Sequence, residues 1–266
     1  ESCLKEKENI RKIIFLYFSN IVHKKLPWGT LIGIRPSKIA LELIEKGENY
    51  EGIIEYFRNH FCCESRKAEL CINVAMKEKN LVNTCSRNIS VYVGMPFCPT
   101  KCLYCSFTSN PIESFKDLVE PYIESLIYEI RQISRYIKKN QLNIECIYFG
   151  GGTPTSVDDE KFEKIIREIY NSFVYGYKVK EFNVECGRPD SITLNKLEIM
   201  KRYKVNRISI NPQTMNDSTL KFIGRNHRVR DIKEKFYMAK KCGFNNINMD
   251  IIVGLPGEGL KHIDKT

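Results

Sequence analysis

The most informative part of the chain is the stretch Met95-Pro-Phe-Cys98-Pro-Thr-Lys-Cys102-Leu-Tyr-Cys105-Ser-Phe107. Its three cysteines are spaced Cys-x3-Cys-x2-Cys. Structural zinc takes four ligands, usually from two paired knuckles, and no further Cys or His occurs from residue 106 to residue 141. Three thiolates on one short loop favour a [4Fe–4S] cluster whose fourth iron stays open to a substrate or cofactor. Zinc binding and a chance spacing are the alternatives.

From residue 89 onward, short β-rich runs alternate with amphipathic helical stretches. The β-rich runs are residues 89–96, 146–149, 181–185, 207–210 and 247–253, and the helical stretches are residues 118–137, 161–173, 193–203 and 231–242. This alternation predicts an α/β fold with a parallel sheet built from βα units. About five units without a Rossmann Gly-x-Gly-x-x-Gly motif favour part of a (β/α)6-type barrel over an open nucleotide-binding sheet.

Polar or glycine-rich features follow each of the five expected strands. In chain order these features are the cysteine loop, Gly150-Gly-Gly-Thr-Pro154, Glu185, Gln213 and Asp250. In barrels the chemistry lies where the strands end, at the carboxyl edge. A sheet with only a structural role ends more often in generic turn residues, so the coincidence predicts an enzyme site.

The glycine run carries no Lys and is therefore not a phosphate-binding P-loop. Glycines allow a ligand to approach the backbone closely, although a tight strand-to-helix turn also explains them. Glu185 is placed to hold an ammonium group or ribose hydroxyls, or else to pair with a lysine. Asn211 and Gln213 lie on the same side of their strand by the two-residue period.

Two further charged residues are candidates. Arg225 suits a bidentate grip on a carboxylate, and a surface position is equally consistent with its sequence context. Asp250 stands among Ile247, Met249 and Ile251. A carboxylate in so apolar a strand needs a partner or a ligand.

Residues 1–88 are expected to form a mainly helical region, followed by the barrel in residues 89–266. Ile10, Ile13, Ile14, Tyr17 and Ile21 recur at helical spacing. After a break at residues 26–29, Ser37 is the expected N-cap of a second helix that Gly47 ends. A further helix is predicted over residues 66–82.

The eight other cysteines are scattered, and a disulfide framework suits a short secreted chain better than this one. Buried free thiols explain most of them, and the adjacent pair Cys62 and Cys63 has a redox role as its alternative. The eight are Cys3, Cys62, Cys63, Cys71, Cys85, Cys146, Cys186 and Cys242.

The composition is that of a globular protein, with 28% charged and 42% hydrophobic residues among 266. The net charge of +10 suits an anionic partner, and a genomic bias toward Lys, Ile and Asn explains it equally well. The apolar run at residues 13–18 is far shorter than the roughly 20 residues that span a bilayer. Without a leader pattern we expect a cytoplasmic protein. The start at Glu1 and the helix-like end indicate a fragment.

Several residue classes argue against ordinary hydrolase chemistry. The four histidines form no triad-like grouping in the sequence, and no Gly-x-Ser-x-Gly motif is present.

The motifs together resemble a known family. The cysteine spacing with Tyr104 resembles the signature of radical S-adenosylmethionine (SAM) enzymes. The strings at residues 91–98, 148–156 (Tyr-Phe-Gly-Gly-Gly-Thr-Pro-Thr-Ser) and 250–257 (Asp-Ile-Ile-Val-Gly-Leu-Pro-Gly) resemble the oxygen-independent coproporphyrinogen dehydrogenases. Residues 26–36 and Val184-Glu-Cys-Gly-Arg-Pro-Asp190 resemble their HemZ branch. The likeness covers essentially the whole chain.

This resemblance implies a set of site residues. Cys98, Cys102 and Cys105 are expected to hold the [4Fe–4S] cluster, whose open iron binds the methionine end of SAM. The implied SAM-contacting and flanking residues are Tyr92, Tyr104, Gly151, Gly152, Thr153, Glu185, Gln213, Arg225 and Asp250.

The resemblance also implies a reaction. One electron from the cluster cleaves SAM, and the 5′-deoxyadenosyl radical removes a hydrogen from a propionate of coproporphyrinogen III. Loss of CO₂ and an electron leaves a vinyl group, and two such conversions give protoporphyrinogen IX. An electron donor and an electron acceptor are required.

The sequence departs from the best-known dehydrogenases at Phe107, where they carry a fourth cysteine. Relatives without this cysteine include haem-binding chaperones, which is the second hypothesis. A radical SAM enzyme that modifies RNA is the third, with only the basic charge in its favour, so a nucleic-acid partner is not expected. A sixth barrel strand and a substrate-covering region are expected to lie beyond this chain.

Overall fold

The structure is a computed structural model that describes residues 2–24, 26–33, 35–79 and 87–266, with side chains described from residue 6 onward. The chain divides into two compact units, Glu1–Thr84 and Cys85–Thr266. This division falls within residues 80–86, which are outside the described part, as are Cys85, the Cys3 side chain and the end of the helix predicted over 66–82. No helix of the described residues combines the length and apolar character that crossing a membrane requires.

The first unit is helical. Its helices are α1 (Ser2–Val22), α2 (Pro36–Glu45), α3 (Tyr50–Phe61) and α4 (Ser65–Lys79). Ala40, Ile53, Phe57 and Ala68 are almost fully buried where α2, α3 and α4 pack together. The first unit therefore has a hydrophobic core of its own.

Two details of the first unit differ from the sequence-based expectation. Ser37 is not the N-cap of α2, because the helix already begins at Pro36 with Arg35 at the cap position. Proline suits the first helical turn, where its missing N–H costs nothing. Helix α3 was not predicted, and it begins where the Asn49 side chain accepts a hydrogen bond from Gly52 N at 2.7 Å.

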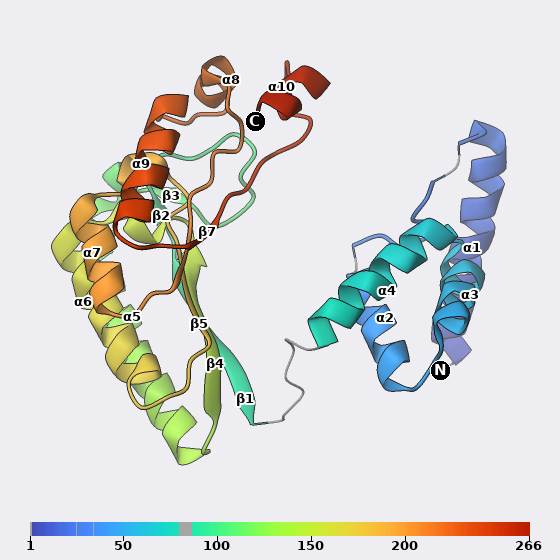
Figure 1. Cartoon of the computed structure of the whole chain (residues 1–266), viewed down its shortest axis with the longest axis horizontal. Helices are drawn as coiled ribbons and strands as arrows, with labels where there is room; N and C mark the ends of the chain where they lie inside the picture. Colours follow the sequence, from blue (N-terminus) through green and yellow to red (C-terminus); the bar gives the residue numbers. More distant parts are fainter. Residues whose placement is uncertain (1, 25, 34, 80–86) are drawn as a thin grey trace. The chain divides into compact units, whose positions relative to one another are not determined.

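The second unit contains a five-stranded parallel sheet, which confirms the predicted α/β fold with about five βα units (Figure 1). The strand order β1-β4-β5-β6-β7 follows the chain, as in a barrel that winds in one direction. The strands are β1 (Asn88–Met95), β4 (Asn143–Gly151), β5 (Glu181–Glu185), β6 (Arg207–Ser209) and β7 (Asn246–Asn248).

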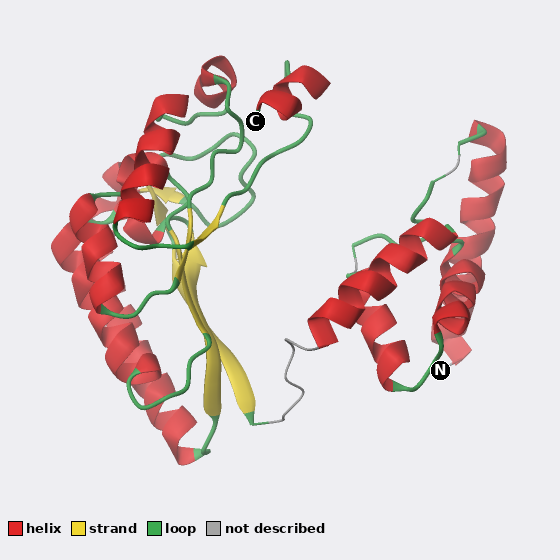
Figure 2. Cartoon of the chain, viewed as in Figure 1, coloured by secondary structure: helices red, strands yellow, loops and turns green. Residues whose placement is uncertain are grey.

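Helices line one face of this sheet (Figure 2). They are α5 (Lys116–Lys139), α6 (Asp159–Ile169), α7 (Leu194–Arg202) and α9 (Val229–Lys241), with the short α8 (Asp217–Phe222) and α10 (Leu260–Lys265) near the carboxyl edge. Local sequence fixes the starts of α6 and α7, since the side chains of Asp158 and Thr193 accept hydrogen bonds from the backbone N–H groups of Lys161 and Lys196. Phe149, Phe162, Phe182 and other apolar side chains fill the layer between helices and sheet.

The last strand is shorter than predicted. The run 247–253 forms a strand only as far as Asn248, and Met249, Ile251 and Val253 are exposed. Strand β7 lies at the edge of the described sheet, so its outer side has no neighbour to bury an apolar run. Only an isolated bridge between Gln213 and Ile251 continues the pairing.

The cysteine loop is closed by a small sheet of its own. Strands β2 (Phe97–Cys98) and β3 (Asn110–Pro111) pair in parallel and bring the two ends of the loop together. The start of the loop lies against the end of β4, because the backbone N–H groups of Gly152 and Thr153 donate hydrogen bonds to Met95 O and Phe97 O.

Candidate active site

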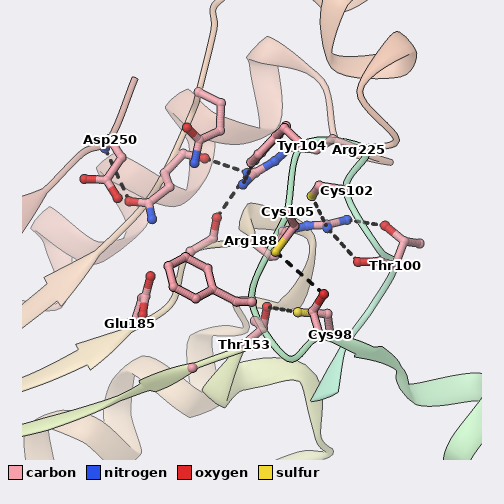
Figure 3. Close-up of a pocket in the computed structure, with 17 residues that line it drawn as sticks. Cys98, Thr100, Cys102, Tyr104, Cys105, Thr153, Glu185, Arg188, Arg225 and Asp250 are labelled. Carbon is pink, nitrogen blue, oxygen red and sulfur yellow. Dashed lines mark hydrogen bonds between the residues drawn. The ribbon is translucent and has the colours of Figure 1, made fainter. Parts of the chain in front are cut away.

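One cavity at the carboxyl edge of the sheet gathers nearly all of the predicted site residues (Figure 3). Its volume is about 140 Å³, roughly ten times what one enclosed water needs. Tyr92 does not line it. Those that do are Cys98, Cys102, Cys105, Tyr104, Gly151, Gly152, Thr153, Glu185, Gln213, Arg225 and Asp250.

Cys98 is held against the glycine segment that follows β4. The Thr153 hydroxyl donates a hydrogen bond to Cys98 Sγ at 3.2 Å, and Thr153 N donates to Phe97 O at 2.7 Å. Burial raises the pKa of the Cys98 thiol, while the Thr153 hydrogen bond and the Arg188 charge act in the opposite direction. These two interactions stabilise a thiolate at this position.

The glycines allow this close approach. A Cβ on Gly152 would lie 2.6 Å from Phe97 O, and one on Gly151 would lie 2.7 Å from Met95 O. Gly151 also has a φ of +106°, which side chains other than glycine avoid. The two residues are glycines because the cysteine-bearing backbone packs directly on them, and both also line the cavity.

Cys102 is held by an arginine that the sequence analysis did not select. Arg188 Nη1 donates to Cys102 Sγ at 3.3 Å and to Thr100 O at 3.2 Å, and Nη2 donates to Thr100 Oγ1 at 2.8 Å. Arg188 comes three residues after the end of β5, so the rule about strand ends applied to it as well. Nothing in the local sequence shows that its side chain reaches the cysteine loop.

Cys105 has a hydroxyl neighbour too. The Ser109 hydroxyl donates to Cys105 Sγ over 3.6 Å. Each of the three sulfurs in the cysteine loop therefore accepts a polar hydrogen bond from the chain, and such donors stabilise sulfur that carries negative charge.

Arg225 joins several parts of the cavity wall. Its Nη1 donates to Gly187 O at 3.1 Å and to Asn211 O at 2.7 Å, and its Nη2 donates to Tyr104 OH at 3.1 Å. Burial raises the pKa of Tyr104 to about 12, with Arg225 opposing the shift. Arg225 Nε is buried and has no partner within the described residues. These bonds use three of the five guanidinium N–H groups, so Nε–H and one Nη2–H remain for the predicted grip on a ligand carboxylate.

Glu185 lies at the end of β5 and points into the cavity (Figure 3). Tyr148 OH donates to Glu185 Oε2 at 3.2 Å. Burial raises the pKa of Glu185 and outweighs the hydrogen bond from Tyr148, which lowers it; the negative charge of Asp250 raises the pKa further, and the Gly151 N–H lowers it slightly. Glu185 therefore lacks a cationic partner among the groups that determine its pKa.

Tyr92 lies outside the cavity, although it is near Glu185. Its ring stacks on Tyr148, with 5.8 Å between the centroids and 12° between the planes. Tyr92 and Phe107 line a neighbouring hollow, and Phe107 lines the cysteine cavity as well. The predicted role of Tyr92 beside the cofactors stays a prediction.

Gln213 and Asp250 come from the segments after β6 and β7. Gln213 adopts a left-handed conformation with φ +64°, and its backbone N donates to Asp250 O at 2.9 Å. Asp250 is exposed and lies beyond the strand in which it was expected, because β7 has already ended at Asn248. Its carboxylate accepts a hydrogen bond from Asn248 Nδ2 at 2.8 Å.

Comparison with known protein families identifies the class to which this chain belongs. The family model for the radical SAM superfamily matches residues 92–266, and the chain therefore belongs to that superfamily. Radical SAM enzymes use a [4Fe–4S] cluster and SAM. The resemblance stated from the motifs is confirmed.

Individual relatives narrow the class. The oxygen-independent coproporphyrinogen-III oxidase-like protein HemZ of Bacillus subtilis (strain 168) is 39% identical over 237 residues, which are 88% of this chain and 47% of HemZ. The heme chaperone HemW of the same organism is 38% identical over 175 residues, or 66% of this chain and 45% of HemW. The chain thus spans less than half the length of these relatives.

A solved structure shares the fold. Coproporphyrinogen III oxidase (HemN) from Escherichia coli matches with a TM-score of 0.59 at 23% identity, over 73% of this chain and 43% of HemN. At that identity the match establishes the fold alone, and any statement about activity has to come from the residues of the site.

The residues present fit an iron–sulfur cluster. Three thiols line the wall of one cavity, and each accepts a hydrogen bond. No three His, Cys, Asp or Glu side chains in the described ranges are arranged around a point where a single metal ion would sit. The cavity that the three thiols line is larger than a water molecule.

Proposed function

We propose that this chain carries the catalytic barrel of an enzyme that converts propionate side chains of coproporphyrinogen III into vinyl groups, giving protoporphyrinogen IX. The observation that carries the proposal is the single cavity in which three thiols meet the polar residues of four strand ends. The similarity to HemZ supports this choice, since it extends over 237 residues, whereas that to HemW extends over 175.

The proposed division of roles follows from the geometry. Cys98, Cys102 and Cys105 hold the cluster, with Tyr104 beside it. When bound, the cluster and SAM supply the chemistry that removes a hydrogen atom from an unactivated carbon. The residues proposed to hold SAM are Gly151, Gly152, Thr153, Glu185, Gln213, Arg225 and Asp250, with Tyr92 in the neighbouring hollow.

Electrostatics support this placement of SAM. SAM carries a sulfonium and an ammonium group, and Glu185 and Asp250 supply negative charge at the cavity. The raised pKa of Glu185 indicates a carboxylate that a cation would stabilise. Arg225 supplies the opposite charge for a ligand carboxylate, with Nε free within the described structure.

The reaction balances with one external electron donor and one external electron acceptor, and the removed hydrogen atom leaves as part of 5′-deoxyadenosine. Each propionate loses one hydrogen atom from its β-carbon, its carboxyl group leaves as CO₂, and one electron passes to an acceptor. The barrel positions the substrate carbon and excludes water. A chain with a net charge of +10 suits a substrate that carries four propionates.

A haem-binding or haem-delivery protein on the same scaffold is the second candidate. Phe107 favours it, because this residue replaces the fourth cysteine of the best-known dehydrogenases and is 74% exposed beside the cavity. The similarity to HemW points the same way.

One experiment separates the two candidates. The full-length protein is reconstituted without oxygen using iron and sulfide, then incubated with dithionite, SAM, an electron acceptor and coproporphyrinogen III. Deoxyadenosine together with a vinyl product, followed by mass spectrometry, supports the oxidase. Tight uptake of haem, added to a parallel sample and followed by absorption, without a vinyl product in the first sample contradicts the oxidase and supports the second candidate.

A further inference from the structure

A buried arginine lies directly under the cysteine loop. Arg188 is only 3% exposed, and its guanidinium bonds to the loop at Thr100 and at Cys102 Sγ (Figure 3). Asp190 lies on its other side, with 3.3 Å from Arg188 Nε to Asp190 Oδ1. A charge removed from water to this degree interacts strongly with its neighbours.

The three sulfurs differ in the donors that they receive. Cys98 and Cys105 accept hydrogen bonds from neutral hydroxyls, those of Thr153 and Ser109. Cys102 accepts one from a cation. Among the described contacts of the loop, the hydrogen bond from a positively charged group thus goes to Cys102, and the Arg188 charge also acts on the neighbouring Cys98.

We propose that Arg188 is a positioning residue that fixes Cys102 and makes the cluster easier to reduce. Reduction adds a negative charge to the cluster, and a buried cation that donates to a ligating sulfur stabilises the reduced form more than the oxidised form. The inference rests on the proposed ligation of the cluster by Cys102. It concerns the potential of the cluster and does not depend on which substrate the enzyme uses.

Replacement of Asp190 tests the proposal in the opposite direction, because it is expected to make the cluster easier to reduce. Its carboxylate balances part of the Arg188 charge, and His227 Nδ1 lies 3.6 Å from it. In Asp190→Asn an oxygen remains to accept from Arg188, but the negative charge is gone. The guanidinium charge then acts on Cys102 without compensation, so the cluster becomes still easier to reduce.

The experiment is a redox titration of reconstituted full-length protein, followed by the electron paramagnetic resonance signal of the reduced cluster. In Arg188→Gln the ratio of reduced to oxidised cluster at a fixed potential falls about tenfold, which is a shift of about 59 mV for one electron. Arg188→Lys keeps the charge and restores most of the ratio. Asp190→Asn raises the ratio above that of the wild type.

Arg131→Gln is the matched control, since Arg131 is an exposed arginine paired with Glu168 on the helical layer. In Arg131→Gln the ratio of reduced to oxidised cluster at the same potential stays within twofold of that of the wild type. An unchanged potential in Arg188→Gln overturns the inference and leaves the proposed function intact. If Arg188→Gln assembles no cluster, Asp190→Asn decides, and a potential at or below the wild-type value overturns the inference. A wild-type protein without a cluster on these cysteines overturns both proposals.

Discussion

Two walls of the same cavity are built in different ways. The cysteine wall, Cys98, Cys102 and Cys105, is half-buried or buried, and every sulfur accepts a hydrogen bond. The acidic wall consists of Glu185 and Asp250. The pKa of Glu185 is raised, and Asp250 is exposed. The sulfurs of the cysteine wall thus accept hydrogen bonds from the chain, whereas the proposed role of the acidic wall is to balance the charge of a positively charged ligand.

The largest effect is expected on the cysteine wall. Cys102→Ala removes a cluster ligand and leaves Arg188 buried beside an alanine, so reconstituted protein loses most of its iron and all SAM cleavage. Iron and sulfide analysis with absorption spectroscopy measures this. Cys146→Ala, which changes a half-buried free thiol in β4 away from the cavity, keeps both. Full iron content in Cys102→Ala would show that the ligands lie elsewhere.

The rigidity of the cysteine wall is tested by a pair of glycines. In Gly152→Ala the new Cβ would lie 2.6 Å from Phe97 O, so we expect a loss of about 2–3 kcal/mol in the free energy of unfolding. In Gly94→Ala the nearest atom lies at 3.6 Å, and the loss is about 0.5 kcal/mol or less. Urea unfolding of both variants measures the difference, and equal stability would contradict the close packing.

The contribution of Asp190, which pairs with Arg188 beneath the cysteine wall, to the free energy of unfolding depends on pH. Burial raises the pKa of Asp190, but His227 and the Arg188 charge outweigh it and lower that pKa to about 2. The carboxylate therefore stabilises the fold by about 1–2 kcal/mol above about pH 4.

This stabilisation disappears as the pH falls from about 4 to about 2, where the folded-state carboxylate takes up its proton. Asp190→Asn is accordingly less stable than the wild type at neutral pH and nearly equal to it near pH 2. Chemical denaturation across this range checks the sign. A constant difference at all pH values would rule out the Asp190 charge as the cause.

The smallest effect concerns the acidic wall. Glu185→Gln weakens SAM binding about tenfold, which is about 1.4 kcal/mol, because the ligand cations lose one counter-charge. In the wild type the affinity rises with pH as Glu185 loses its proton, from a pKa above its ordinary value, and in Glu185→Gln that dependence is lost. Calorimetry on the reconstituted protein at several pH values measures the affinity for SAM and its dependence on pH.

Glu181→Gln provides the matched control for that measurement. Glu181 lies at the start of the same strand and is bonded to Arg207. Its replacement leaves SAM affinity and the pH dependence unchanged. A Glu185→Gln variant that binds SAM as tightly as the wild type would remove Glu185 from the proposed ligand site.

The sequence alone predicted the sheet and the position of the cavity. Hydrophobic alternation located β1 and β5, and the rule that parallel strands end at a common edge brought the glycine run, Glu185 and Gln213 to the cysteine loop. These features depend on local pattern and on topology, which a sequence displays directly. The chemical roles of the residues stay predictions until cofactor binding is measured.

Other features depend on contacts between distant segments. The reach of Arg188 to Cys102 joins residues 86 positions apart, and no periodicity signals it. The exposure of Asp250 depends on what borders β7, which the local apolar run cannot show. Helix α3 was not predicted, although Asn49 suits an N-cap and Ile53, Phe57 and Phe61 recur at helical spacing.

The short segment before Arg225 also ties the cysteine loop to the ligand side. Ile223 O accepts a hydrogen bond from Leu103 N at 3.1 Å, and Gly224 O accepts one from the Thr100 hydroxyl at 2.9 Å. An ordered loop thus holds the backbone that positions the Arg225 guanidinium. If iron and SAM bind as proposed, the two binding equilibria are linked, and each raises the affinity for the other by the same factor.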